Sequence, residues 1–221
     1  MEPPLQAEDE YWEMRYRKGG NSGAGSVGSI REWKWRVIEQ YAGEIDDVMD
    51  VGCGDLSFWK GRDCAKYFGL DASPTVIERD KRERPSWEFR VHRAEIRLEG
   101  IRARVVLCSD VLFHIMNDDD YKHILENICQ YSREWLFVHT WSRNPFNLRW
   151  MLQSFRSHKK LHLMWMLTGS DGEYQKFRHF ENYLNIFDRA GFALIGKEGK
   201  GVGTMYVFRQ RQSAHNGGQR L

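Results

Sequence analysis

The chain has 221 residues, 41% of them hydrophobic, and its 33 basic and 31 acidic side chains leave a formal net charge of +2. This composition excludes a disordered chain and suits one globular domain with a sizeable core. So small a net charge is no argument for a dedicated nucleic-acid-binding protein. The four cysteines form no C-x-x-C pair, which favours reduced thiols over a zinc site or a disulfide framework.

The N-terminal segment, MEPPLQAEDE, is acidic and contains proline, unlike a signal peptide. No window approaches 18 consecutive apolar residues, so we expect no transmembrane helix. Together these features predict a cytoplasmic protein.

Helical and strand-like patterns alternate along the chain. Residues 9–18 are charged and aromatic at helical spacing, and 29–42 predict an amphipathic helix with Ser29 as N-cap and Glu32 completing a capping box. Apolar or alternating runs predict strands within 46–52, 65–71, 87–94, 102–110, 134–140, 193–199 and 204–210. Further helices are expected over 74–83, 117–132 and 180–190.

This alternation predicts an α/β fold. The last two strands are joined by a short glycine loop and must be antiparallel, because a parallel crossover needs a dozen residues or more. We therefore expect a doubly wound, seven-stranded, mainly parallel sheet with an antiparallel C-terminal strand pair.

Two glycine-rich turns compete for the role of a phosphate or cofactor loop. The stretch 20–29, GNSGAGSVGS, spells G-x-G-x-x-G, but a helix-like segment precedes it where a dinucleotide loop needs a strand. A flexible Gly/Ser linker is the simple alternative. The second turn, Gly52–Gly54, does follow a strand, and Asp71 ends the next strand 17 residues later. An acid at that place can accept both hydroxyls of a ribose.

Four segments, VMDVGCGD, YFGLDASPTVIER, VVLCSDVLFHI and WLFVHT, resemble the successive motifs of class I S-adenosylmethionine-dependent methyltransferases. The resemblance covers about residues 45–210, and the expected antiparallel hairpin is also that family's. YW, RY, GGNSGAGS and GLDASPT are similar to a small bacterial-type subgroup, which usually has Tyr where Val27 stands. Many members have a third glycine where Leu56 stands.

The resemblance implies S-adenosylmethionine as cofactor and a set of residues around it. Asp50 and the backbone of Gly52, Cys53 and Gly54 would face its methionine portion. Asp71 would hold the ribose hydroxyls. The other implied cofactor contacts are Ala72 beside the adenine, Glu95 at its amino group, and Ser109 and Asp110 along the sulfonium.

The glycine-rich stretch is then interpreted as a hinge and lid over residues 1–28, preceding a methyltransferase domain over 29–210 and a mobile tail over 211–221. The aromatic and basic side chains of this arm would fold over the cofactor while backbone amides of 21–26 approach it. The arm residues expected at the cofactor are Tyr11, Trp12, Arg15, Tyr16, Asn21 and Gly23.

Methyl transfer from a sulfonium needs no acid for the leaving group, and a base only if the acceptor must lose a proton. The candidates for a base are His114 after the fourth strand and His139 at the end of the fifth, with Tyr11 in the arm as a third catalytic candidate. Trp141 and His179 occupy neighbouring positions. For each histidine a structural role is the alternative.

Residues 142–178 form an unusually long connection with seven Lys or Arg side chains and two acids, and we expect them to form an acceptor-binding cap. The predicted acceptor is a small molecule or glycan, methylated at oxygen. The alternatives are an RNA or protein methyltransferase that uses the basic cap, and a non-catalytic cofactor-binding subunit. The acidic run 117–120 favours a helix start over a metal site, so no metal is expected.

Overall fold

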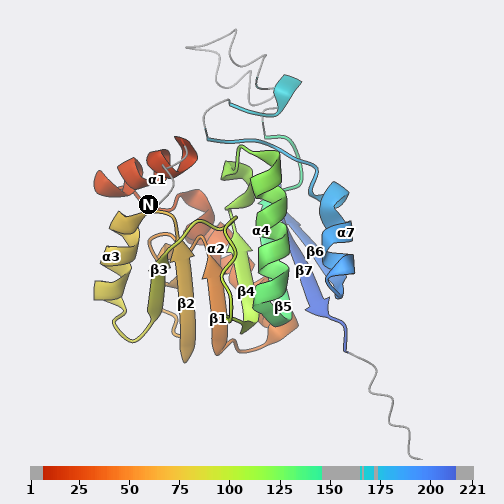
Figure 1. Cartoon of the computed structure of the whole chain (residues 1–221), viewed down its shortest axis with the longest axis horizontal. Coiled ribbons are helices and arrows are strands. Elements are labelled where there is room, and N and C mark those ends of the chain that lie inside the picture. Colours follow the sequence, from red (N-terminus) through yellow and green to blue (C-terminus); the bar gives the residue numbers. More distant parts are fainter. Residues whose placement is uncertain (1–6, 146–164, 166, 172–173, 213–221) are drawn as a thin grey trace, which may run out of the picture.

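The computed structural model describes residues 7–145, 165, 167–171 and 174–212 (Figure 1). Most of the predicted cap at 142–178, and all but two residues of the predicted tail, therefore lie outside the described residues. Within the described part of the chain, no helix is both long and apolar enough to cross a membrane.

Seven strands form a single sheet. They are β1 (Asp47–Val51), β2 (Lys66–Asp71), β3 (Glu88–Val91), β4 (Ala103–Ser109), β5 (Ser132–Trp141), β6 (Phe192–Lys200) and β7 (Gly203–Gln210). Their order is β3-β2-β1-β4-β5-β7-β6, with parallel pairs from β3 to β5 and β7 antiparallel to both of its neighbours. The predicted seven-stranded sheet with an antiparallel C-terminal pair is confirmed.

Helices cover both faces of this sheet, which explains why its central strands are continuous apolar runs. The helices are α1 (Ala7–Arg17), α2 (Gly28–Ala42), α3 (Pro74–Glu83), α4 (Asp118–Tyr131) and α7 (Leu184–Arg189). Alternate residues of β1 separate the two cores: Val48 packs with Trp35 and Ile38 of α2, whereas Met49 packs on the face covered by α4 and α7. Figure 1 views the sheet with α4 in front.

Two of the helices begin at side-chain caps, whereas the cap predicted for α2 is wrong. Helix α2 begins at Gly28 after an extended Val27 and has no side-chain cap, so the Ser29 capping box is wrong. The chain enters this helix directly from a short 3-10 turn, η1 (Ala24–Ser26), and Glu32 pairs with Arg31 instead. Ser73 caps α3, and Asn117 caps α4, as side chains that accept backbone N–H bonds.

Helix α1 is fastened to the start of α3 by one buried carboxylate. Glu13 accepts hydrogen bonds from the hydroxyls of Ser73 and Thr75, and from the Thr75 backbone N–H at 3.2 Å. Arg17 also donates to Glu13, over 2.7 Å. The negative charge lies at the positive end of the α3 dipole, where it is stabilised. The N-terminal arm is thereby held beside the carboxyl ends of β1 and β2.

Replacing Glu13 by Ala should release α1. The change leaves donors of Ser73 and Thr75 without their acceptor, and we expect a loss of about 1–3 kcal/mol in the docking of the arm. Hydrogen exchange measured by mass spectrometry should accelerate over Ala7–Arg17, with the sheet unchanged. Glu10→Ala, an exposed position on the same helix, is the control and should leave exchange as in the wild type. Equal protection in both variants would refute the role of Glu13.

Candidate active site

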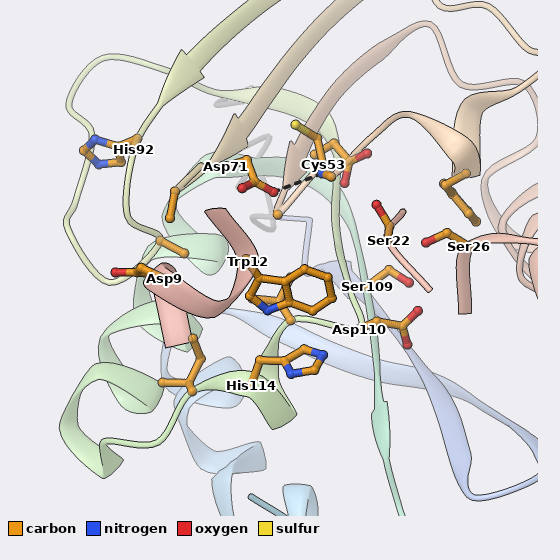
Figure 2. A pocket seen from close by; sticks show the side chains of 18 of the residues that line it. Asp9, Trp12, Ser22, Ser26, Cys53, Asp71, His92, Ser109, Asp110 and His114 are labelled. Atoms are coloured by element: carbon orange, nitrogen blue, oxygen red, sulfur yellow. Dashed lines mark hydrogen bonds between the residues drawn. The ribbon is translucent and has the colours of Figure 1, made fainter. Parts of the chain in front are cut away.

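A pocket opens at the carboxyl ends of β1, β2 and β4, the edge at which open α/β sheets bind ligands. Figure 2 shows this pocket, with Asp9 and Trp12 of α1 across from Ser22 and Ser26 of the glycine loop, and with Asp71, Ser109 and Asp110 from the strand ends. Twelve predicted site residues line it: Trp12, Tyr16, Asp50, Gly52, Cys53, Gly54, Asp71, Ala72, Glu95, Ser109, Asp110 and His114. The structure therefore brings together residues that lie far apart in the sequence.

The second glycine turn is held against β2 by its own backbone. Gly52 and Gly54 both adopt left-handed φ angles, of 74° and 59°, which glycine reaches without strain. The N–H groups of Gly52 and Cys53 donate to the Leu70 carbonyl at 2.8 and 2.9 Å. This arrangement turns the chain away from β1 and leaves the backbone open to the pocket.

Asp71 faces this turn from the end of β2. Its carboxylate accepts from the backbone N–H groups of Gly54 at 3.1 Å and of Ser73 at 2.9 Å (Figure 2). Burial raises the pKa of Asp71 to about 6, although both hydrogen bonds oppose the shift. The carboxyl is thus mostly ionised above about pH 6, so at neutral pH it can accept hydrogen bonds from hydroxyl groups of a ligand.

Asp50, at the end of β1, is positioned by two aromatic side chains that the sequence analysis missed. Trp59 Nε1 donates to its carboxylate at 2.7 Å, and the Tyr67 hydroxyl donates at 3.0 Å. Burial raises the pKa of Asp50 to about 6 as well. Both donors are buried on the face of the sheet that α2 and α3 cover, where Trp59 also packs edge-on against Trp35.

The pocket is lined by acids. Its carboxylates are those of Asp9, Asp50, Asp71, Glu95 and Asp110, and no Lys or Arg occurs among the described residues that line it. Arg93, just outside the lining, lies 2.6 Å from Glu95 and 3.3 Å from Asp9. A cavity with this excess of negative charge favours a cationic ligand.

The N-terminal glycine-rich loop forms part of the pocket wall. Ser22 donates to the Asp55 carboxylate at 2.7 Å and accepts from the Asp55 backbone N–H at 2.9 Å. A Cβ atom on Gly54 would overlap with the Ser22 hydroxyl, and one on Gly25 would overlap with the Asp110 carboxylate. Ser22 and Ser26 both line the pocket. The G-x-G-x-x-G stretch is therefore part of the site wall, although its sequence spells a different motif.

Four predicted arm contacts lie outside the lining, because they organise the arm itself. Arg15 Nε donates to the Asn21 carbonyl at 2.6 Å, and the Asn21 side chain accepts from the Gly23 N–H at 3.0 Å. The Tyr11 ring stacks on Tyr174 at 3.9 Å. Direct contact of Tyr11, Arg15, Asn21 and Gly23 with a cofactor stays a prediction. Trp12 and Tyr16, by contrast, line the pocket.

The two candidate histidines occupy different environments. His114 lines the pocket, packs edge-on against Trp12 at 4.9 Å, and has its Nδ1 at 3.0 Å from the Tyr174 carbonyl. Because a carbonyl only accepts, Nδ1 carries the proton and Nε2 keeps its lone pair. Burial lowers the pKa of His114 to about 4. His139 lies outside the lining and bonds Asp110 through Nδ1.

The remaining aromatic candidates also lie outside the lining. The Trp141 ring stacks on Phe113 at 4.1 Å. His179 is exposed and packs edge-on against Phe177 at 4.8 Å. Neither side chain reaches the pocket in this structure.

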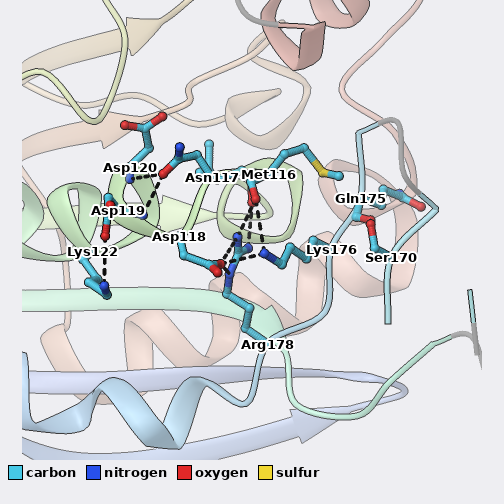
Figure 3. A network of polar contacts seen from close by, with 11 residues as sticks. Met116, Asn117, Asp118, Asp119, Asp120, Lys122, Ser170, Gln175, Lys176 and Arg178 are labelled. Atoms are coloured by element: carbon cyan, nitrogen blue, oxygen red, sulfur yellow. Dashed lines mark hydrogen bonds and ion pairs between the residues drawn. The ribbon is translucent and has the colours of Figure 1, made fainter. Parts of the chain in front are cut away.

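The acidic run at 117–120 anchors the end of the predicted cap. Asp118 accepts from Lys176 at 2.7 Å and from Arg178 at 2.8 Å, while Asn117 caps α4 (Figure 3). Among the described residues, no group of three or more His, Cys, Asp or Glu side chains could hold a metal ion. Two of the seven cap cations are thus engaged in ion pairs with the domain.

Several solved methyltransferase structures share this fold at low sequence identity. The N-methyltransferase NodS from Bradyrhizobium japonicum WM9, in complex with S-adenosyl-L-homocysteine, has a TM-score of 0.64 at 11% identity, covering 94% of this chain and 100% of that chain. The magnesium protoporphyrin IX methyltransferase ChlM from Synechocystis PCC 6803, with S-adenosylhomocysteine bound, scores 0.59 at 14% identity, covering 92% and 98%. A putative methyltransferase in complex with the Haloferax volcanii Trm112 methyltransferase activator scores 0.61 at 14% identity, covering 96% and 100%.

Residues 49–134, which contain the glycine turn, Asp71 and the strand ends of the pocket, match the family profile described as a methyltransferase domain. Over these residues the chain matches a methyltransferase domain, and the chain as a whole has the fold of class I S-adenosylmethionine-dependent methyltransferases. No curated protein sequence matches it. The acidic pocket fits S-adenosylmethionine, which bears a positive sulfonium and two ribose hydroxyls.

One departure from the family pattern has a backbone explanation. Leu56 stands where many members have a third glycine, and its φ of 56° is left-handed. The position favours glycine for that reason, and the methyltransferase tolerates leucine because the side chain is buried in the core beside Trp35 and Phe58.

Asp71→Asn should weaken cofactor binding. The substitution keeps the size of the side chain but removes the charge and one acceptor, so we expect the dissociation constant for S-adenosylhomocysteine to rise about 10- to 100-fold. Isothermal titration calorimetry measures it directly. Asp119→Asn, at a side chain that is 78% exposed, is the matched control and should bind as the wild type does. Identical constants for the two variants would rule out a ribose contact at Asp71.

Proposed function

We propose that this methyltransferase transfers the methyl group to a hydroxyl of a small-molecule or glycan-like acceptor, with His114 as general base. The observation that carries the proposal is the state of the His114 ring. It lies at the pocket, its Nδ1 proton is directed to the Tyr174 carbonyl, and its lowered pKa keeps it neutral at physiological pH. A neutral ring with a free Nε2 can accept a proton from a hydroxyl.

The cofactor supplies an activated methyl group and a leaving group that needs no proton. The protein then has to align the acceptor, exclude water and accept one proton. In the proposed reaction the acceptor oxygen forms the new bond to carbon as the carbon–sulfur bond breaks. The hydroxyl proton moves to Nε2 of His114, which the Tyr174 carbonyl holds in the required tautomer.

The arm and the end of the cap meet at this base. The Tyr11 ring of α1 stacks on Tyr174, the Trp12 ring lies edge-on to His114, and the backbone N–H of Lys176 donates to the Phe113 carbonyl at 2.8 Å. These contacts support an acceptor site between the arm, the cap and the strand ends. The aromatic rings there suit an acceptor with an apolar or sugar-like face.

The structure favours no second acceptor class. The RNA and protein alternatives depend on the basic residues of the cap, and residues 146–164 lie outside the described part of the chain. Of the three cap cations that the structure describes, Lys176 and Arg178 are paired with Asp118. The similar solved structures include a named N-methyltransferase and a porphyrin methyltransferase, so the preference for oxygen rests on His114 alone.

His114→Asn should abolish most turnover while cofactor binding persists. A panel of phenols, sugars, amines and RNA, offered with methyl-labelled S-adenosylmethionine, identifies the acceptor class by mass spectrometry. With the best hydroxyl acceptor we expect kcat to fall about 100-fold or more, the usual contribution of a general base. The cofactor dissociation constant should stay within about threefold, because the proposal gives the ring a role toward the acceptor and none in holding the cofactor.

His123→Asn, an exposed position on α4, is the control and should leave kcat unchanged. Wild-type turnover in His114→Asn would refute the base. Methylation of an amine but of no hydroxyl would refute the oxygen acceptor. A protein that binds the cofactor and methylates nothing would instead be a cofactor-binding partner subunit.

A further inference from the structure

A buried ionic cluster lies beside the cofactor pocket, and the proposed reaction makes no use of it. It consists of Lys34, Ser109, Asp110 and His139, here called the Lys34 cluster. Lys34 Nζ donates to the Ser109 hydroxyl at 2.9 Å and to one oxygen of Asp110, and His139 Nδ1 bonds the other oxygen. Both oxygens of one carboxylate are therefore engaged by side chains of two different elements, α2 and β5.

Lys34 is unusual for its burial. Its side chain is fully buried, in the middle of α2, next to the core residue Trp35. Burying an ammonium group is costly unless an opposite charge and hydrogen-bond acceptors compensate it. Here Asp110 and Ser109 supply both, so the lysine cannot be a solvated surface charge that happens to lie near the pocket.

The backbone of Asp110 gives a second, independent sign of a specialised role. Its φ of 65° is left-handed, one of only two such non-glycine residues among the described ones. Aspartate reaches this region more readily than most side chains, but the conformation is uncommon outside glycine. The glycine loop fits around it, because a Cβ atom on Gly25 would overlap with the Asp110 carboxylate.

The cluster is oriented with its negative end toward the cofactor. Ser109 and Asp110 line the pocket, whereas Lys34 and His139 lie behind them. Figure 2 shows Asp110 and Ser109 on the same side of the pocket as Ser22 and Ser26 of the glycine loop. A ligand in the pocket therefore meets the carboxylate first and the ammonium only at a greater distance.

We propose that the Lys34 cluster selects the cationic cofactor over its neutral product. In this arrangement Lys34 is a positioning residue that holds Asp110 ionised and fixed at the pocket wall, and the Asp110 carboxylate favours a sulfonium over a thioether. Methyl transfer removes the positive charge from the cofactor, so the same carboxylate weakens the hold on the product that must leave.

Asp110 suits this role better than the other acids of the pocket. No cation among the described residues bonds the carboxylate of Asp71, and burial raises the pKa of Asp71 and of Asp50 to about 6. Burial also acts on Asp110, but His139 and Lys34 outweigh it and hold the pKa of Asp110 well below its usual range. Asp110 is thus the acid of this wall that stays fully ionised throughout the neutral range.

The test compares the affinity of each variant for the charged and the neutral ligand. Calorimetric titrations of full-length protein with S-adenosylmethionine and with S-adenosylhomocysteine give two dissociation constants, and their ratio reports selectivity. For Asp110→Asn we expect the constant for S-adenosylmethionine to rise about tenfold while that for S-adenosylhomocysteine changes less than about threefold. Lys34→Met should lower the selectivity for S-adenosylmethionine in the same way. Lys34→Arg, which keeps the positive charge, should lower it less than Lys34→Met does.

Lys18→Met, at an exposed lysine just after α1, is the matched control and should keep the wild-type ratio. If Asp110→Asn weakens both ligands equally, or neither, the cluster only shapes the pocket and the proposal is wrong. Should a single variant fail to fold because it leaves one buried charge unpaired, the double variant Lys34→Met/Asp110→Asn removes both charges. It must then show the lost selectivity, and wild-type selectivity in it would equally overturn the proposal.

Discussion

The pocket depends on a close approach between the N-terminal arm and the strand ends. One glycine on each side, Gly25 in the arm and Gly54 after β1, makes this approach possible because neither has a Cβ atom. Ser22 lies over Gly54, where it bonds both the backbone and the carboxylate of Asp55, and Gly25 lies against Asp110. Without these approaches the carboxyl ends of β1, β2 and β4 would form an open edge. With these two contacts, residues of the arm and of the strand ends enclose one pocket, from which water can be excluded.

The helix that follows this loop also carries the lysine that holds the Asp110 carboxylate at the pocket. Helix α2 begins directly after the glycine loop, and its second turn places Lys34 under Asp110. Displacing the loop would therefore disturb the ion pair as well as the pocket wall. At the other end of the arm, Glu13 fastens α1 to α3, so the closed arrangement is held from both sides.

Much of this architecture is readable from the sequence, because the strands are continuous apolar runs and the last two are joined by a short loop. The glycine turn and Asp71 are found for the same reason, since both lie next to predicted strand ends. The Ser29 capping box fails because the N-cap is Val27, two residues earlier, a difference decided by the 3-10 turn before the helix. The left-handed Leu56 has no local signal, because its residue type argues against that conformation.

The arm and the ionic cluster are harder to predict because they depend on contacts across 33 to 76 residues of sequence. Ser22 and Gly25 are ordinary residues of a stretch that resembles a flexible linker, and only the fold brings them to Gly54 and Asp110. The sequence does indicate that Lys34 is buried. Lys34 stands four residues after Ile30 and four before Ile38, in the apolar stripe of its helix. A lysine in that stripe requires a buried partner.

The closed arm is tested most directly by the affinity of the protein for S-adenosylmethionine with and without residues 1–28, measured by calorimetry. If the arm forms one wall of the pocket, the shortened protein should still unfold cooperatively. It should bind the cofactor at least about tenfold more weakly than the full chain, since it loses the enclosing contacts. Equal affinity in the two proteins would show that the arm is a linker and that the strand ends alone hold the cofactor.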